Sequence, residues 1–380
     1  MNRTLAEHLD PKVGPKRILA LDGGGIRGAL TLGYLKKMET ILRQQHNDPN
    51  LLLCDYFDLI GGTSTGSIIA ASLAVGRTVD EITDMYMELG GKIFSGKRNW
   101  WNPLETAKFL KANYDYKALE NSLKGAFGDI TLGSDKIRTG LCIVAKRADT
   151  NSVWPLINHP NGKYFDSAIG KNKNIALWQA VRASSAAPTY FAPQMIDVGD
   201  GHRAAFVDGG VSMANNPALT LLMVATLKGF PFHWPMGEKN ISVVSVGTGY
   251  SVFTKQVDDI DDATMLTWAS NVPDMLMQDA SWQNRVVLQW LSNSATAELL
   301  DGEMGTLEGD VLGGNPWIKY LRYNFPITID SMNTLNIENG KKYSNKDIAN
   351  LVEMSNAENR YILYKIGLAA SAEISEDHFN

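Results

Sequence analysis

Cysteine is scarce in this sequence, and long apolar runs are missing. Only Cys54 and Cys142 occur among the 380 residues, both in apolar surroundings, and no spacing typical of a zinc site is present. Two buried thiols are typical of a cytosolic protein rather than of a disulfide-stabilised secreted domain. No stretch approaches the roughly 18 apolar residues of a membrane-spanning helix, and the N-terminal residues lack the apolar core of a signal peptide. We therefore expect a cytoplasmic chain.

Basic charge is also in short supply. The formal net charge is −5, which argues against binding to a nucleic acid polymer. The sequence contains no Gly-Lys-Ser or Gly-Lys-Thr, so a Walker A phosphate loop is excluded. A local exception runs from Lys92 to Arg98 and continues into Trp100 and Trp101. Basic residues beside paired tryptophans suit a lipid interface, and a solvated loop with packed aromatics fits equally well.

Short apolar runs alternate with helical patterns along the first two thirds of the chain. Hydrophobic residues make up 44% of the sequence, which is enough for a sizeable core. Strands are predicted at 18–21, 58–60, 137–144, 205–207 and 241–246, and helices near 29–45, 67–90, 104–111, 116–125 and 175–183. Strands that alternate with helices favour a mostly parallel sheet covered on both faces. The predicted fold is a three-layer α/β/α sandwich.

The character of the sequence changes after the acidic run at 258–262. The next segment, 263–300, is helical in pattern and rich in tryptophan and methionine, which more often form a core or an interface than a ligand site. We predict an N-terminal arm at 1–14, an α/β domain at 15–257, and a helical C-terminal extension at 258–380 that packs on this domain. Three roles stay open for the extension: it caps an active site, forms a dimer contact or senses a regulator.

One serine lies in a tight turn between a predicted strand and a predicted helix. The segment Gly62-Thr63-Ser64-Thr65-Gly66 follows an apolar strand end and precedes a run of small and apolar residues. Glycine on both sides of Ser64 lets the strand and the helix approach closely, which is the physical basis of the G-x-S-x-G nucleophile elbow. Such an elbow exposes the hydroxyl oxygen and directs the first N–H groups of the helix toward a developing oxyanion. A plain glycine-rich connection is the alternative interpretation.

A second glycine-rich segment, Asp22 to Gly28, also joins a predicted strand to a predicted helix. Its clustered N–H groups beside Arg27 are typical of a cradle that stabilises an oxyanion. Gly23, Gly25 and Gly28 also match the G-x-G-x-x-G pattern of dinucleotide-binding folds. That pattern requires a strand ending in an acidic residue about 20 residues further on, whereas the region around 43–48 is polar. Phosphate binding therefore stays the rival interpretation.

A serine nucleophile needs a base that accepts its proton. None of the six histidines follows a convincing predicted strand; they are His8, His46, His159, His202, His233 and His378. Asp208 does, because it comes directly after the apolar pair Phe206-Val207 and before Gly209-Gly210. Aspartates are common in turns, so a structural role is the alternative. Asn216 and Pro217 then predict the start of a further helix.

Together these elements resemble the patatin-like phospholipases. The family pattern has D-G-G-G-x-R-G, G-x-S-x-G and D-G-G segments in that order, matched here by residues 22–28, 62–66 and 208–210. The stretches 183–191 and 215–217 are also similar to the family. The resemblance covers roughly residues 15–250, whereas residues from about 260 onward match no pattern of the family.

The resemblance implies a lipid acyl hydrolase with a Ser64–Asp208 dyad in place of a triad. Asp208 would take the proton from Ser64, and Ser64 would attack the fatty-acyl ester carbonyl of a glycerophospholipid through an acyl-enzyme. The implied oxyanion hole consists of Gly23, Gly24, Gly25, Arg27, Gly28 and Thr65. Neither a metal nor a cofactor is implied. The domain at 15–257 would be catalytic, and the chain would touch the membrane surface transiently and peripherally.

Two other functional interpretations stay open. One is a nucleotide-responsive binding protein that uses Gly23 to Gly28 to bind phosphates. Ester hydrolysis that is lost in Ser64→Ala would instead indicate the hydrolase. The other combines both ideas in a regulated bacterial effector that degrades membrane lipids, because some bacterial relatives are switched on by a small nucleotide in phage defence. A homodimer and a small nucleotide activator therefore stay open as partners.

Overall fold

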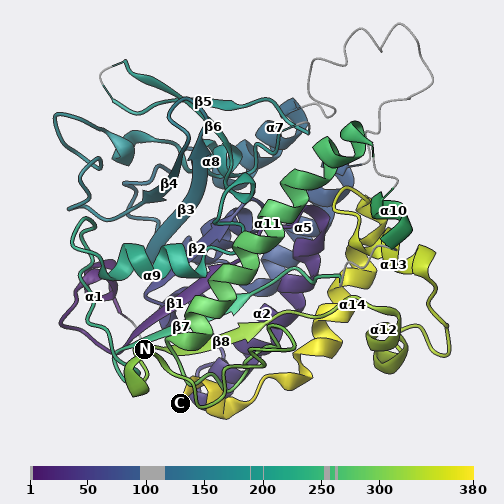
Figure 1. Ribbon diagram of the computed structural model, residues 1–380. Coiled ribbons are helices and arrows are strands. Elements are labelled where there is room, and N and C mark those ends of the chain that lie inside the picture. Colours follow the sequence, from purple (N-terminus) through teal and green to yellow (C-terminus); the bar gives the residue numbers. More distant parts are fainter. Residues whose placement is uncertain (1–2, 95–115, 189, 200, 252–256, 262–263) are drawn as a thin grey trace, which may run out of the picture.

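An eight-stranded sheet forms the middle of the molecule (Figure 1). The structure, a computed structural model, describes residues 3–94, 116–188, 190–199, 201–251, 257–261 and 264–380. The strand order is β5-β6-β3-β2-β1-β7-β8, and β4 also pairs with β3. The strands are β1 (Lys16–Leu21), β2 (Leu59–Thr63), β3 (Gly140–Arg147), β4 (Ser152–Ile157), β5 (Gln194–Asp197), β6 (Arg203–Asp208), β7 (Ile241–Val246) and β8 (Lys319–Tyr323). Strands β3, β2, β1, β7 and β8 run parallel, whereas β4, β5 and β6 pair antiparallel.

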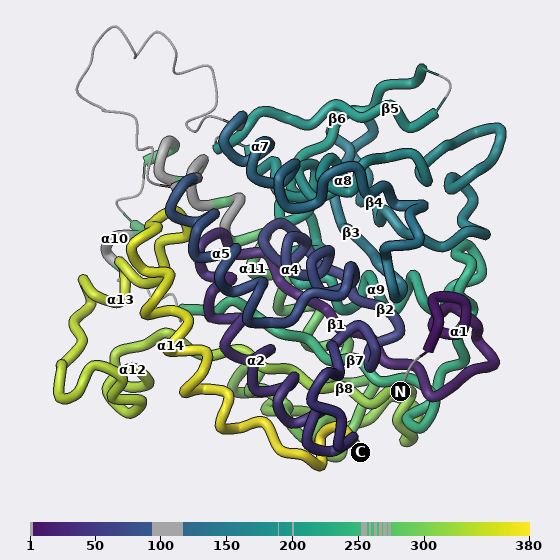
Figure 2. The backbone as a smooth tube through the Cα atoms, turned by 180° about the vertical axis from the view of Figure 1, so that it is seen from behind, coloured from purple at the N-terminus to yellow at the C-terminus, as the bar shows by residue number. Residues whose placement is uncertain are grey.

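Helices cover both faces of the sheet, so the predicted sandwich is confirmed. Figure 1 shows α9 and α11 on one face, and Figure 2 shows α2, α4, α5 and α14 on the other. The helices are α1 (Leu5–Leu9), α2 (Gly28–Gln45), α3 (Leu53–Tyr56), α4 (Thr65–Ala74), α5 (Val79–Phe94), α7 (Tyr116–Phe127), α8 (Leu177–Ser184), α9 (Ala218–Thr226), α10 (Val257–Asp261), α11 (Met265–Trp290), α12 (Ile329–Leu335), α13 (Asn345–Val352) and α14 (Arg360–Ala370). Alternate residues of β1 enter two separate cores: Leu19 and Leu21 pack on the side of α2, and Ile18 and Ala20 on the side of α9.

Several element boundaries differ from the prediction. Strands β4, β5 and β8 were not expected, and the helix predicted near 67–90 is two helices, α4 and α5. Gly76, with φ +85°, lies in the break between them, because a left-handed residue ends a helix. The helix predicted at 104–111 and most of the basic and tryptophan-rich patch, residues 95–101, lie outside the described residues. Both cysteines are buried and unpaired, as expected. In the described part of the chain, no helix is long and apolar enough to span a bilayer.

The C-terminal region is helical, as predicted, but it also completes the sheet. Strand β8 pairs with β7 in parallel register, and α14 crosses α2 at very short range. A Cβ added to Gly367 would lie 2.0 Å from the carbonyl oxygen of Leu30, so only glycine permits this crossing. The division of the chain at residue 257 stays a prediction. What the structure adds is that the region after it contributes to the same sheet and to the same core.

A buried ion pair joins the two regions. The guanidinium of Arg322 on β8 donates from Nη1 and Nη2 to the two carboxylate oxygens of Asp22, at 2.9 and 2.6 Å. Both residues are almost fully buried, at 3% and 5% exposed. Nη1 also donates to the hydroxyl of Ser245 on β7 at 2.6 Å. Because Asp22 is the first residue of the glycine-rich segment, the C-terminal region holds that segment directly.

We predict that Arg322→Met is strongly destabilising, because it leaves the Asp22 carboxylate buried without a cation. Breaking a buried pair from one side typically costs about 3–5 kcal/mol. The double variant Asp22→Asn, Arg322→Met removes both charges and is expected to be more stable than Arg322→Met alone. Urea denaturation followed by circular dichroism measures both. Lys36→Met, which breaks an exposed pair with Asp80, is the control and should lose about 1 kcal/mol at most. An equally small loss in Arg322→Met would contradict this account.

Candidate active site

Two strands converge on one edge of β3 and bring the predicted nucleophile and base together. Strand β2 pairs with residues 140–144 of β3, and β6 pairs antiparallel with residues 145–147, next along the chain. Strand β4 pairs with residues 142–147, so it takes the opposite edge. Thr63 is in register with Val144, and Asp208 with Ala145. The ends of β2 and β6 therefore meet, and Ser64 follows directly on one of them.

Ser64 occupies the strained turn that its flanking glycines predict. Its backbone has φ +53° and ψ −124°, a conformation that a residue with a Cβ rarely adopts. Helix α4 begins at the next residue. A Cβ on Gly66 would lie 2.2 Å from the carbonyl oxygen of Leu21, and one on Gly62 would lie 2.2 Å from the carbonyl of Gly66. The two glycines are thus required by close packing of β1, β2 and α4.

A second serine, to which no sequence pattern assigns a role, anchors this turn. The hydroxyl oxygen of Ser184, the last residue of α8, accepts a hydrogen bond from the N–H of Ser64 at 2.8 Å. The same hydroxyl donates to the carbonyl oxygen of Val144 at 2.6 Å. Ser184 lies in the stretch 183–191 that resembles the family, so the signal was present without an assignment. Its position ties the strained turn to β3.

Asp208 is buried at the end of β6, close to the hydroxyl of Ser64. The N–H of Gly210 donates to its carboxylate at 2.7 Å, and the Ser64 hydroxyl favours its ionised form. Removal from water raises the pKa of Asp208 to about 6, and the interactions with Ser64 and Gly210 keep it from rising further. A carboxylate with this pKa is a stronger proton acceptor than an ordinary aspartate and is still mostly ionised at neutral pH.

No histidine takes part in this arrangement. All six lie in the described part of the chain, and none hydrogen-bonds to Ser64 or Asp208. His8 instead contacts the buried carboxylate of Asp58, at 2.8 Å from Nδ1. His159 packs edge-on against Phe232, and burial lowers its pKa to about 4. Ser64 and Asp208 therefore form a pair that has no histidine partner.

The glycine-rich segment passes beside the turn of Ser64, but its N–H groups are not equivalent. Those of Gly23, Arg27 and Gly28 already donate to carbonyl oxygens, of Asn215, Gly24, and Gly25 with Ile26, respectively. Those of Gly24, Gly25 and Thr65 have no acceptor among the described residues. Of the six residues predicted to form the oxyanion hole, these three have an N–H group without an acceptor in the described structure, and the hole itself stays a prediction. Few donors are left for the cradle that the rival phosphate-binding interpretation requires.

The side chain of Arg27 is half-buried. Its Nε is buried without a hydrogen-bond partner, and burial lowers the pKa of Arg27 to about 10, although the nearby charges of Asp22 and Glu353 oppose the shift. Asn215 is a further neighbour that sequence reasoning left without a role. Its carbonyl oxygen accepts from the N–H of Gly23 at 3.0 Å. Helix α9 begins at Ala218 with Pro217 as its cap residue, so it starts one residue later than predicted, and the Oδ1 of Asn216 accepts from the N–H of Ala218 at 3.0 Å.

Comparison with known proteins identifies the family of this chain. The family model "Patatin-like phospholipase" matches residues 19–222, which is more than half of the sequence. The chain belongs to the patatin-like phospholipase family. The matched region includes Ser64 and Asp208, and it ends before β7, β8 and α14. Arg322, which holds the start of the glycine-rich segment, therefore lies outside the part of the chain that the family model describes.

Patatin-like relatives occur in bacteria and plants. A "cGAMP-activated phospholipase" of Vibrio cholerae is 33% identical over 64% of this chain and 66% of its own length. One of the same name in Escherichia coli is 30% identical over 61% of this chain and 62% of its own length. "Patatin-like protein 4" of Arabidopsis thaliana is 27% identical over 87% of this chain and 82% of its own length. The chain thus spans slightly less than two thirds of the two bacterial relatives. The printed names of these relatives agree with the family that the model assigns.

Two solved structures also match, but weakly. "Human GIVD cytosolic phospholipase A2" has a TM-score of 0.40 at 9% identity and covers 94% of this chain and 58% of its own. "VipD from Legionella pneumophila" has a TM-score of 0.34 at 13% identity and covers 92% of this chain and 66% of its own. Likenesses at this level support no conclusion about the site.

We predict that Asp208→Asn changes how stability depends on pH. The folded-state pKa of Asp208, about 6, lies above its ordinary value of 3.8. The folded chain therefore binds this proton more tightly than the unfolded chain, and the wild type loses stability as the pH rises between these two values. A difference of two pH units corresponds to about 3 kcal/mol, and the neutral amide lacks this loss.

Urea denaturation between about pH 4 and pH 7 measures the effect, because the variant's advantage over the wild type should grow with pH across that window. Asp135→Asn, at an exposed aspartate, is the matched control and should follow the wild-type curve. A constant difference between wild type and Asp208→Asn at every pH would argue against a raised pKa.

Proposed function

We propose that this chain hydrolyses fatty-acyl ester bonds of glycerophospholipids, with Ser64 as nucleophile and Asp208 as general base. The proximity of the Ser64 hydroxyl to the buried Asp208 carboxylate, whose ionised form it favours, carries the proposal. It pairs a hydroxyl in a strained turn with a base whose pKa is raised, and no histidine hydrogen-bonds to either residue. Membership of the patatin-like phospholipase family supports the substrate class.

The acylation step follows from these contacts. Asp208 takes the proton of Ser64 as Oγ bonds to the acyl carbonyl carbon, and the carbonyl oxygen becomes an oxyanion. The N–H groups of Gly24, Gly25 and Thr65 donate to this oxyanion, because they have no other acceptor in the described structure. The protonated Asp208 then gives its proton to the departing alcohol oxygen of the lysophospholipid, which leaves an acyl ester on Ser64.

Deacylation repeats the same chemistry with water. Asp208, again ionised, takes a proton from a water molecule as its oxygen attacks the acyl carbonyl. The oxyanion is held by the same three N–H groups. When it collapses, the bond to Ser64 breaks, the fatty acid leaves, and Asp208 returns the proton to the serine oxygen. Neither half of the reaction needs a histidine, a metal or a cofactor, so the dyad suffices for the complete cycle.

We also propose that a small nucleotide activates this hydrolase, as in a regulated effector that degrades membrane lipids. The names of the Vibrio cholerae and Escherichia coli relatives support this, because both proteins are called cGAMP-activated. The enzyme would reach its phospholipids by transient contact with the membrane surface. Lipid hydrolysis measured with and without cGAMP on phospholipid vesicles tests activation separately from catalysis.

We predict that Ser64→Ala abolishes hydrolysis and leaves the fold intact. Removing the nucleophile stops acyl-enzyme formation, and alanine changes no contact that holds the turn, since Ser64 is bound there through its backbone N–H. Mass spectrometry of fatty acids released from phospholipid vesicles measures the loss. A fluorophosphonate probe should label wild type at Ser64 alone. Ser72→Ala, near the far end of the helix that follows Ser64, is the control and should be labelled like the wild type. Strong labelling at another residue would refute the assignment.

We predict that kcat/KM falls about tenfold per pH unit below about pH 6, since only ionised Asp208 accepts the proton and its pKa is raised to about 6. Asp208→Asn should lose about 10²–10⁴-fold in activity. His159→Gln, His202→Gln and His233→Gln should each keep substantial activity, because no histidine contacts the dyad. Steady-state kinetics across the pH range measures both. A histidine variant as inactive as Ser64→Ala, with its circular dichroism spectrum unchanged, would replace the dyad by a triad.

A further inference from the structure

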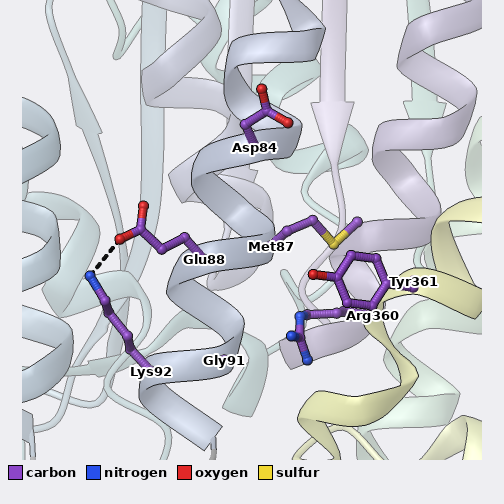
Figure 3. Close-up of a pocket in the computed structure, with 7 residues that line it drawn as sticks. All are labelled: Asp84, Met87, Glu88, Gly91, Lys92, Arg360 and Tyr361. Atoms are coloured by element: carbon purple, nitrogen blue, oxygen red, sulfur yellow. Dashed lines mark hydrogen bonds and ion pairs between the residues drawn. The ribbon is translucent and has the colours of Figure 1, made fainter.

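A groove lies between α5 and the beginning of α14, apart from the catalytic pair. Its volume is about 450 Å³, and Asp84, Met87, Glu88 and Lys92 line it from α5. Arg360 and Tyr361 line it from α14, and Figure 3 shows Met87 and Tyr361 approaching each other across it. Pockets that hold small molecules range over roughly 300–1,000 Å³, so this volume suits one.

The side chains of the groove indicate which class of molecule it suits. Arg360 forms no ion pair among the described residues, and its Nε is buried without a hydrogen-bond partner. Its guanidinium carbon lies 4.5 Å from the ring centre of Tyr361, which is 56% exposed. Lys92 supplies a second cation and is paired with Glu88 at 2.6 Å. A planar cation and an exposed ring bind a phosphate and an aromatic base.

The carboxylates of the groove complete this pattern. Asp84 and Glu88 lie on the α5 side, opposite Arg360 and Tyr361. Carboxylates accept hydrogen bonds from the amino groups of bases and from sugar hydroxyls, which simple phosphate and an acyl chain lack. With cations, carboxylates and an aromatic ring together, the groove matches a nucleotide better than a lipid tail or a free anion.

Both walls of the groove also hold the glycine-rich segment. On the α5 side, the hydroxyl of Tyr86 donates to the carbonyl oxygen of Gly25 at 2.5 Å. On the other side, the carbonyl oxygen of Met354, six residues before Arg360, accepts from the N–H of Ile26 at 2.9 Å. Gly90 of α5 lies beside both the segment and the groove, because a Cβ there would be 2.6 Å from the side chain of Ile26 and 3.7 Å from that of Arg360. A molecule that bridges the walls therefore contacts both elements that hold the segment with the Gly24 and Gly25 N–H groups.

We propose that this groove is the binding site of a nucleotide, and that its occupancy sets the position of the glycine-rich segment. This proposal rests on the nucleotide activation proposed above and assigns a binding site to the activating nucleotide. The nucleotide's phosphate contacts Arg360 and Lys92, and its base contacts Tyr361. Binding favours the arrangement of α5 and α14 in which it bridges them, and that arrangement fixes Gly25 through Tyr86 and Ile26 through Met354.

Calorimetric titration of the full chain with cGAMP, ATP, inorganic phosphate and glycerophosphoglycerol tests the site without requiring catalysis. Arg360→Gln should weaken binding of the nucleotide by at least about tenfold, because it removes a charge-assisted contact to phosphate. Lys92→Gln, at an exposed position of α5, should weaken it as well. Lys365→Gln, the same change of charge at an exposed position of α14 outside the groove, is the matched control and should bind like the wild type.

Vesicle hydrolysis by the same variants tests the coupling, and the nucleotide concentration for half-activation should rise in parallel with the dissociation constant. Unchanged nucleotide binding in both Arg360→Gln and Lys92→Gln would overturn the site. So would the absence of nucleotide binding to the wild type, or tighter binding of glycerophosphoglycerol, which would make the groove a lipid headgroup site. Nucleotide binding that depends on Arg360, in a chain that hydrolyses no lipid, would uphold the groove and refute only the proposed hydrolase.

Discussion

The buried pair of Asp22 and Arg322 is the contact on which the arrangement of this molecule depends. Each charge is almost fully removed from water, and each is compensated chiefly by the other. Asp22 begins the glycine-rich segment, and Arg322 belongs to β8, far along the chain. A hydrogen bond from Arg322 to Ser245, and one of 3.3 Å from Ser245 to Asn216, extend the connection to the turn before α9. The free energy of this network thus couples the C-terminal region to the loop beside Ser64.

The pair of Ser64 and Asp208 illustrates how a site is built at the expense of local stability. The backbone of Ser64 is held in a conformation that costs free energy, and the Asp208 carboxylate is kept from water. Neither arrangement would persist in isolation. The Ser184 hydroxyl, the packing of Gly62 against Gly66 and the pairing of β6 with β3 impose them from outside. Such conflict between local preference and tertiary structure is typical of functional sites.

Much of the fold could be predicted because its elements have strong local signals. The strand of Ile18 and the helix after Ser64 are apolar runs bounded by glycines, and the structure has both. The sequence missed β4, β5 and β8, which are short or carry polar residues that weaken the pattern. It also treated six residues as equivalent oxyanion donors. Which N–H groups are engaged depends on Asn215 and on the local 3₁₀ turn, and spacing alone carries no such information.

By itself the sequence determined the local conformations and the family. Glycines at 62 and 66 allow the turn at Ser64, and the order of three short motifs predicted the patatin-like family, which the family model confirms. Only the tertiary structure decided which residues meet. Ser64 and Asp208 lie 144 residues apart, and they come together because β2 and β6 share one edge of β3. The same holds for Asp22 with Arg322 and for α5 with α14: contacts between distant segments arise from packing and pairing, and periodicity within a segment does not encode them.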